Sequence, residues 1–129
     1  MLPPIDHDYL QARAPGSTVV LDGGMICVVI PSLALPTGFM TTHADLLLRL
    51  SPGYPDVPPD MWWFEPAVSR ADGREIPCTQ SLETYLGRTW QRWSRHLGPG
   101  QWRSGIDSLE SYLTLVHAEL RTAAEGLAA

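Results

Sequence analysis

The sequence contains no lysine: arginine supplies all nine of its Lys and Arg positions among 129 residues. Chemistry that depends on a lysine amine is therefore excluded, whether as a general base, a Schiff base or the lysine of a phosphate-binding loop. The codon bias of a GC-rich genome would produce the same absence, so on composition alone it carries no functional meaning.

Excess positive charge and long apolar runs are also missing. The formal net charge is -5, whereas a protein that binds phosphate backbones usually has a basic surface. The longest apolar runs, such as residues 26–30, are too short to cross a bilayer, and the first residues lack the features of a signal peptide. We therefore expect a cytoplasmic protein with no nucleic-acid partner and no membrane partner.

Metal-binding and cofactor-binding patterns are absent as well. The two cysteines, Cys27 and Cys78, are far apart and form no C-x-x-C motif, and the four histidines lack the spacing of a zinc site. No dinucleotide-binding, phosphate-loop or nucleophile-elbow motif occurs. We therefore expect no metal and no cofactor, and a reducing cytosol disfavours a disulfide between the two thiols.

The residues that are present predict one small α+β domain, with 44% hydrophobic and 18% charged residues. Residues 1–16 form a polar leader in which 6–13 can make a short helix. The domain spans 17–122, and 123–129 are expected to fray. Four antiparallel strands are expected at residues 17–22, 25–30, 44–50 and 61–64. Cys27 lies inside the second of these runs, so we expect a buried and inert thiol.

The connections and helices follow from proline content and apolar spacing. Residues 31–42 and the proline-rich 51–59 read as loops, and 67–89 as mostly irregular. The spacing of Trp90, Trp93 and Leu97 predicts a short helix over 90–96. A C-terminal amphipathic helix is predicted by apolar residues at alternating three- and four-residue steps from Ile106 to Leu120, with Ser104 as its N-cap.

Four segments, taken in their order along the chain, resemble the segments of a known family. Residues 54–59 read Tyr-Pro-Asp-Val-Pro-Pro, and the strand Met-Trp-Trp-Phe follows at 61–64. Residues 72–78 read Asp-Gly-Arg-Glu-Ile-Pro-Cys, and Trp102 precedes the last helix. Over about residues 17–120 the chain resembles the ubiquitin-conjugating enzyme (UBC-like) superfamily, and most closely its compact bacterial branch, prokaryotic family E.

The resemblance implies a fold, a site and partners. The fold is a four-stranded antiparallel meander with flanking helices and a C-terminal amphipathic helix. In this family a long segment called the flap carries the catalytic cysteine. The residues expected to shape it here are Tyr54, Pro55, Pro58, Pro59 and Trp102. The partners are a ubiquitin-like protein, a ubiquitin-activating-type enzyme, a protein target and a JAB-type deconjugating peptidase of the same pathway.

Cys78 stands at the place of the family's catalytic cysteine, where it would be the nucleophile that carries the modifier as a thioester. Cysteine suits this role because its thiolate is both a strong nucleophile and a good leaving group. His96 would act as a base or orient the acceptor, and Asp72 would deprotonate the incoming amine. The alternatives are an incidental loop thiol at Cys78, an exposed or helix-capping histidine at 96 and a solvated acid at Asp72 or Glu75.

The chain departs from the family just before the cysteine, where the family's His-Pro-Asn is replaced by Glu65, Pro66 and Ala67. This departure favours a second hypothesis, a catalytically inactive UBC-like module that binds a ubiquitin-like protein or its activating enzyme. A third hypothesis is an unrelated α+β adaptor. The absence of lysine has a functional consequence if the protein is an active conjugating enzyme. A lysine near a Cys78 that carries the modifier would be a dead-end acceptor of it.

Overall fold

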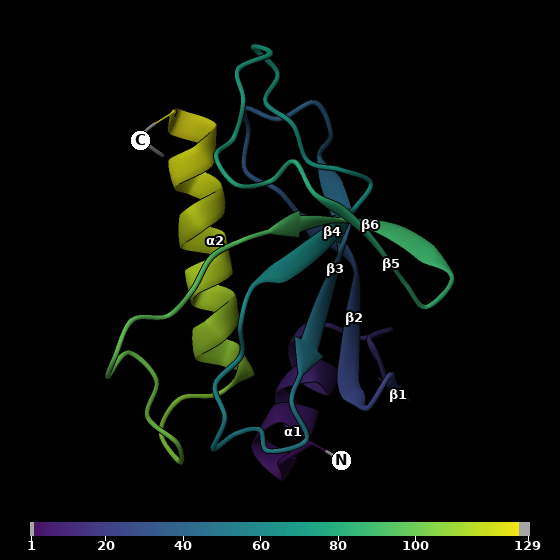
Figure 1. Ribbon diagram of the computed structural model, residues 1–129, viewed down its shortest axis with the longest axis vertical. Coiled ribbons are helices and arrows are strands. Elements are labelled where there is room, and N and C mark those ends of the chain that lie inside the picture. The colour runs from purple at the N-terminus through teal and green to yellow at the C-terminus, as the bar shows by residue number, and fades with distance from the viewer. Residues whose placement is uncertain (1, 127–129) are drawn as a thin grey trace.

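A computed structural model of the protein describes residues 2–126, in which two helices pack with a curled antiparallel sheet of six strands (Figure 1). The elements are, in chain order, α1 (Pro4–Arg13), β1 (Thr18–Asp22), β2 (Met25–Ala34), β3 (His43–Leu50), β4 (Trp62–Glu65), β5 (Leu82–Tyr85), β6 (Arg88–Trp93) and α2 (Leu109–Glu125). None of the helices in this part of the chain is long and apolar enough to span a bilayer.

The first four strands form the predicted meander, in the order β1-β2-β3-β4. Strand β2 is longer than predicted, because it continues through Pro31 to Ala34 where we expected a loop. A bulge between Ile30 and Leu33 makes this extension compatible with proline. Within it, the backbone N–H of Ser32 donates to the carboxylate of Asp45 on β3 at 2.8 Å.

The strand count differs from the four expected, because β5 and β6 form a second hairpin that pairs with β4 through β6. Residues 67–81 contain no named helix or strand, as predicted, but the prediction was wrong for residues 82–89, which belong to this hairpin, and for the helix over 90–96. Trp90 and Trp93 lie on opposite faces of β6, each in a different buried cluster, so their three-residue spacing only imitates a helix. The hairpin turns at Leu86 and Gly87, which have φ of 58° and 70°.

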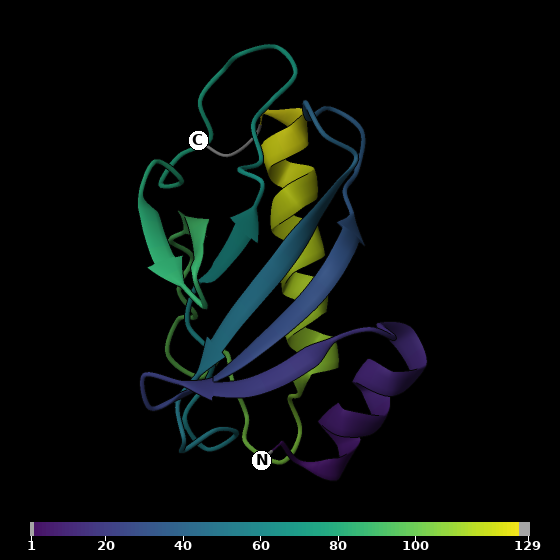
Figure 2. The same ribbon diagram turned by 90° about the vertical axis from the view of Figure 1, so that its right-hand side faces the viewer.

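The main core lies between the sheet and α2, which crosses one face of the sheet (Figure 2). The buried residues of α2 recur on one side of the helix: Leu109, Tyr112, Leu113, Val116, Leu120 and Ala123. They pack with the inward side chains of β2, β3, β4 and β6, including Trp62, Phe64 and Trp93. The amphipathic pattern of the sequence thus identified the core face of α2.

Helix α2 begins later and ends later than the sequence suggested. Its N-cap is Ser108 rather than Ser104, since the Ser108 N–H donates to the Ser111 hydroxyl at 2.9 Å. Ile106 consequently precedes the helix and is exposed. The tail expected to fray from residue 123 overlaps the helix, which continues to Glu125 and closes with Gly126 at φ 75°. Residues 127–129 lie outside the described residues.

A second, smaller cluster fills the opposite face of the sheet. It consists of Cys27, Val29, Leu47, Trp63 and Trp90, with Met61, Tyr85 and Leu86 packed against it. The β5–β6 hairpin contributes three of these eight residues, which explains how the curled sheet buries side chains on the face away from α2. Cys27 has no exposed surface, which confirms the expected buried thiol.

Candidate functional site

Cys78 lies in an irregular segment immediately before β5, and its thiol is exposed. Its backbone has φ 60°, in the left-handed region that residues other than glycine seldom adopt. The Cys78 carbonyl accepts a 3.0 Å hydrogen bond from the N–H of Ser94, the residue that follows β6. The thiol-bearing loop is therefore fastened to the sheet at the cysteine itself.

Side chains brace this loop on both sides of the cysteine. The amide of Gln80 donates to the Ile76 carbonyl at 2.7 Å and accepts from the Thr79 N–H at 3.1 Å. Arg95 donates to the Pro77 carbonyl at 3.0 Å. Ile76 and Thr79 are themselves buried. The loop therefore presents Cys78 from a constrained backbone, which is the arrangement a nucleophile needs.

His96 follows this bracing segment and forms a pair with Asp60. Its Nδ1 lies 2.6 Å from an Asp60 carboxylate oxygen. The pairing is set by the sheet, because the Met61 N–H donates to the Arg95 carbonyl at 3.1 Å and so continues the β4–β6 ladder outward. The carboxylate fixes one ring nitrogen, which leaves the other free to face solvent. No hydrogen bond joins His96 to Cys78 within residues 2–126.

A cavity of about 350 Å³ opens between α2 and the segment that leads into it. His96, Trp102, Tyr112 and Glu119 are among its lining residues. Arg95 also lines it and joins it to the cysteine loop, since the guanidinium pairs with Glu119 at 2.9 Å and donates to Pro77. The cavity thus adjoins the cysteine loop through Arg95 and combines apolar side chains with carboxylate and imidazole groups.

Asp72 lies in the segment before the cysteine loop, where it pairs with Arg70. Arg70 Nε donates to one carboxylate oxygen at 2.9 Å, and the backbone N–H of Arg74 donates to the same oxygen at 3.0 Å. These donors hold the pKa of Asp72 well below its usual range. Arg70 also donates to the Ala123 carbonyl at 2.6 Å. Asp72 therefore orients an arginine that fastens the segment to α2.

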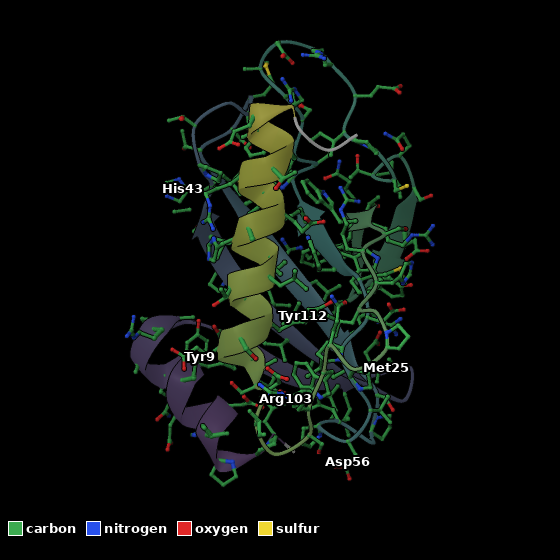
Figure 3. The ribbon with its side chains drawn as sticks, turned by 90° about the vertical axis from the view of Figure 1, so that its left-hand side faces the viewer. Tyr9, Met25, His43, Asp56, Arg103 and Tyr112 are labelled. Atoms are coloured by element: carbon green, nitrogen blue, oxygen red, sulfur yellow. The ribbon has the colours of Figure 1, made fainter. Side chains whose placement is uncertain are left out.

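Tyr54 and Trp102 come together at the other end of α2. Trp102 donates to the Pro55 carbonyl at 2.8 Å, and the Tyr54 and Trp102 ring centroids are 6.0 Å apart. Pro59 is buried, whereas Pro58 is exposed. In Figure 3, Tyr9 and Arg103 flank this end of the helix, and Asp56 lies in the neighbouring loop.

Asp6 of α1 completes this end of the fold and was not singled out in the sequence. Its carboxylate is buried, accepting a 2.6 Å hydrogen bond from the Tyr54 hydroxyl and a 2.9 Å bond from the Leu109 N–H at the start of α2. Burial, followed by the hydrogen bond to the negatively charged Asp6, raises the pKa of Tyr54. Only the position of Asp6 in the first turn of a helix is visible in the sequence, and that feature does not indicate long-range bonding.

The expected site residues thus fall into two groups along α2. Tyr54, Pro55 and Trp102 gather near Leu109, while the cysteine loop adjoins Glu119 through Arg95. At the rise of an α-helix, these two positions are about 15 Å apart. The proline-rich segment therefore frames the N-terminal end of α2 and does not contact the thiol loop in any hydrogen bond found among the described residues.

The described residues contain no cluster of three or more side chains suited to holding a metal ion. Comparison with curated proteins found no match, and comparison with solved structures found none either. A family model, prokaryotic E2 family E, matches residues 2–123. That span includes both helices almost entirely, all six strands and the cysteine loop. The chain therefore belongs to prokaryotic E2 family E.

Proposed function

We propose that this protein accepts a ubiquitin-like modifier as a thioester on Cys78 from an activating enzyme and transfers it to a target amine. Membership of an E2 family suggests a role in ubiquitin-like conjugation in general. The observation that supports the finer proposal is the contrast between the cysteines. Cys78 is exposed on a braced loop, whereas Cys27 has no exposed surface.

The first step exchanges one thioester for another. The Cys78 thiolate attacks the carbonyl carbon of the modifier bound to the activating enzyme, a new C–S bond forms, and the thiolate of the activating enzyme leaves. In the second step the target amine attacks the same carbonyl carbon and loses a proton. A C–N bond forms, and the Cys78 thiolate is released unchanged.

His96 is the best candidate for the base that takes the proton from the attacking amine. Its ring is oriented by Asp60, it lines the cavity that adjoins the cysteine loop, and imidazole is the side chain most often used as a general base. Asp72 was the other candidate, but its depressed pKa makes it a weak base. We propose that Asp72 instead positions the segment before Cys78 through Arg70.

The partners of this reaction follow from the proposed chemistry. A ubiquitin-activating-type enzyme supplies the thioester, a ubiquitin-like protein is the group transferred, and a protein target supplies the amine. A JAB-type peptidase of the same pathway would reverse the conjugation. These reactions consume ATP through the activating enzyme and fit a protein that works in the cytoplasm.

An inactive UBC-like module that binds the modifier or its activating enzyme is the second candidate. One observation favours it: β4 ends at Glu65 and is followed by Pro66 where the family has His-Pro-Asn, and Glu65 is engaged by Arg88. An ion-paired carboxylate cannot supply the hydrogen-bond donors of that motif. The two candidates differ in whether Cys78 becomes acylated.

The test combines the protein with ATP, an activating enzyme and a ubiquitin-like protein from the same organism. The proposal predicts an adduct on non-reducing gels that disappears with thiol reductant. Cys78→Ala should abolish the adduct, and Cys27→Ala should retain it. An activating enzyme that charges itself but never charges wild-type protein would contradict the enzyme and favour the binding module.

A further inference from the structure

Strand β5 is the outermost strand of the sheet, and one of its edges is unpaired within residues 2–126. The Ser81 carbonyl accepts a 2.9 Å bond from the Arg92 N–H, and Tyr85 and Arg88 are paired across the turn. In an antiparallel ladder, hydrogen-bonded pairs alternate with unbonded pairs. The backbone N–H and C=O groups of Leu82 and Thr84 therefore point away from β6 toward solvent.

Apart from its length of only four residues, β5 has few of the features by which proteins protect unpaired edge strands. Lysine, proline and charged side chains normally discourage pairing at an edge. The outward residues Leu82 and Thr84 carry no charge, and Leu82 is 64% exposed. The charged residue between them, Glu83, is held by Trp63 and Arg92. Figure 1 shows the hairpin projecting from the sheet on the side away from α2.

The β5 edge is continuous with the nucleophile. Cys78 lies four positions before Leu82, and the segment between them runs along the extension of β6, through the Cys78–Ser94 and Ser81–Arg92 bonds. A strand added antiparallel to β5 would run from Tyr85 toward Leu82. Its C-terminal end would then point toward Cys78, the direction that a thioester-forming tail requires.

We propose that the β5 edge receives the extended C-terminal tail of the ubiquitin-like modifier as an added antiparallel strand. The inference rests on the proposed function, because the tail is the part of the modifier that must reach Cys78. Main-chain hydrogen bonds to Leu82 and Thr84 hold the tail, and the Leu82 side chain supplies an apolar contact.

The chain lengths agree with this arrangement. At the rise of a β-strand, Cys78 and Leu82 are at most about 13 Å apart, because the turn at Cys78 shortens the segment, and about four tail residues can cover this span. About two more residues reach Thr84. A tail of roughly six residues is therefore long enough to carry both the thioester and the strand pairing.

The edge of β1, at the opposite side of the sheet, provides a matched comparison. Leu21 on β1 is 65% exposed, as Leu82 is on β5. Five strand-to-strand steps separate the two edges in the order β1-β2-β3-β4-β6-β5, and about 24 Å of sheet lies between them at the usual spacing. A tail bound at β1 would not lead to Cys78.

The experiment uses synthetic peptide thioesters as probes and follows acylation of Cys78 by intact mass spectrometry. N-acetylglycine thioester is too short to reach β5, whereas an eight-residue peptide thioester ending in glycine is long enough. We expect transfer from the longer peptide to be about tenfold faster, equivalent to about 1.4 kcal/mol. Leu82→Asp and a peptide N-methylated at alternate residues should both remove that advantage, whereas Leu21→Asp should keep it.

The outcomes separate the inference from the proposed function. Equal rates for both thioesters, or an advantage that survives Leu82→Asp, would overturn the tail site and leave the thioester function standing. Failure of both thioesters to acylate Cys78 would overturn the proposed function and, with it, the tail site. A protein that dimerises through β5, with dimerisation lost in Leu82→Asp and no length dependence, would assign the edge to a second copy instead.

Discussion

The backbone N–H of Ser94 donates a 3.0 Å hydrogen bond to the carbonyl of Cys78. The bond places the cysteine loop beside the end of β6, two residues before His96, or about 7 Å along an extended chain. His96 in turn is oriented by Asp60 at 2.6 Å. One short extension of β6 therefore carries both the anchor of the thiol loop and the imidazole proposed as the base.

Replacing the His96 imidazole should leave formation of the Cys78 thioester (charging) intact and slow transfer of the modifier to an amine (discharge). His96→Ala should leave thioester formation intact and slow transfer to an amine by about a hundredfold, because proton removal by a positioned base contributes on that order. Asp60→Asn should slow discharge less, since the ring remains but its orientation is lost. Single-turnover discharge to a small amine measures both effects. His7→Ala, an exposed histidine of α1, is the control, and an unchanged rate in His96→Ala would remove His96 from the mechanism.

The bracing of the cysteine loop by Gln80 predicts a second effect. Gln80→Ala removes one hydrogen bond to Ile76 and one to Thr79, with a loss of about 2 kcal/mol of loop stability. We expect thioester formation to slow by roughly tenfold while the melting temperature changes little. The matched control is Gln11→Ala, on the exposed side of α1. Gln80→Ala with wild-type charging kinetics would show that the brace has no role in presenting the thiol.

Introduced lysines should report where the acyl group resides. Arg74 is exposed and lines a small cavity with Pro77, next to the nucleophile. Arg74→Lys should therefore create self-conjugation once Cys78 is charged, because a nearby amine has a high effective concentration. Peptide mapping of the charged protein detects the isopeptide bond.

Arg13→Lys, at the end of α1, is the distant control and should stay unmodified. Arg88→Lys is less suitable, since Arg88 pairs with both Asp45 and Glu65. If Arg74→Lys charges normally and never modifies itself, the absence of lysine in this chain has no protective meaning.

The buried carboxylate of Asp6 should be a stability determinant. Asp6→Ala removes the acceptor of two hydrogen bonds and leaves the Tyr54 hydroxyl and the Leu109 N–H without a partner. We expect the free energy of unfolding to fall by about 3 kcal/mol in urea titrations. Asp8→Ala, at an exposed position of the same helix, should change it by less than about 0.5 kcal/mol. Equal stability of the two variants would contradict the network.

The parts of the fold that the sequence predicted are those set by local pattern. Alternating and β-branched runs identified β1 to β4, and the spacing of Leu109, Leu113, Val116 and Leu120 identified α2. The second hairpin was missed because Trp90 and Trp93 face opposite sides of β6 at a helix-like spacing. Its Leu86-Gly87 turn also lacks the asparagine or aspartate that usually marks such turns.

The candidate site was likewise predictable from the sequence only where local pattern determines it. The burial of Cys27 and the irregular backbone around Cys78 followed from their local sequence. The hydrogen bonds made by Asp60, Gln80 and Asp6 could not be predicted from the sequence, because they depend on contacts set by tertiary structure. Asp60 and His96 are 36 positions apart, and Asp6 and Leu109 are 103 positions apart. Only the packing of α1, β4 and β6 against α2 brings such groups together.

The thioester on Cys78 is tested most directly by the intact mass of the protein after incubation with ATP, the activating enzyme and the modifier. We expect a gain equal to the mass of the modifier minus one water, mapped to Cys78 and reversed by thiol reductant. Cys78→Ser should give the same gain as an oxyester that resists the reductant. An activating enzyme that carries the modifier itself while wild-type protein gains no mass at Cys78 would contradict the thioester function.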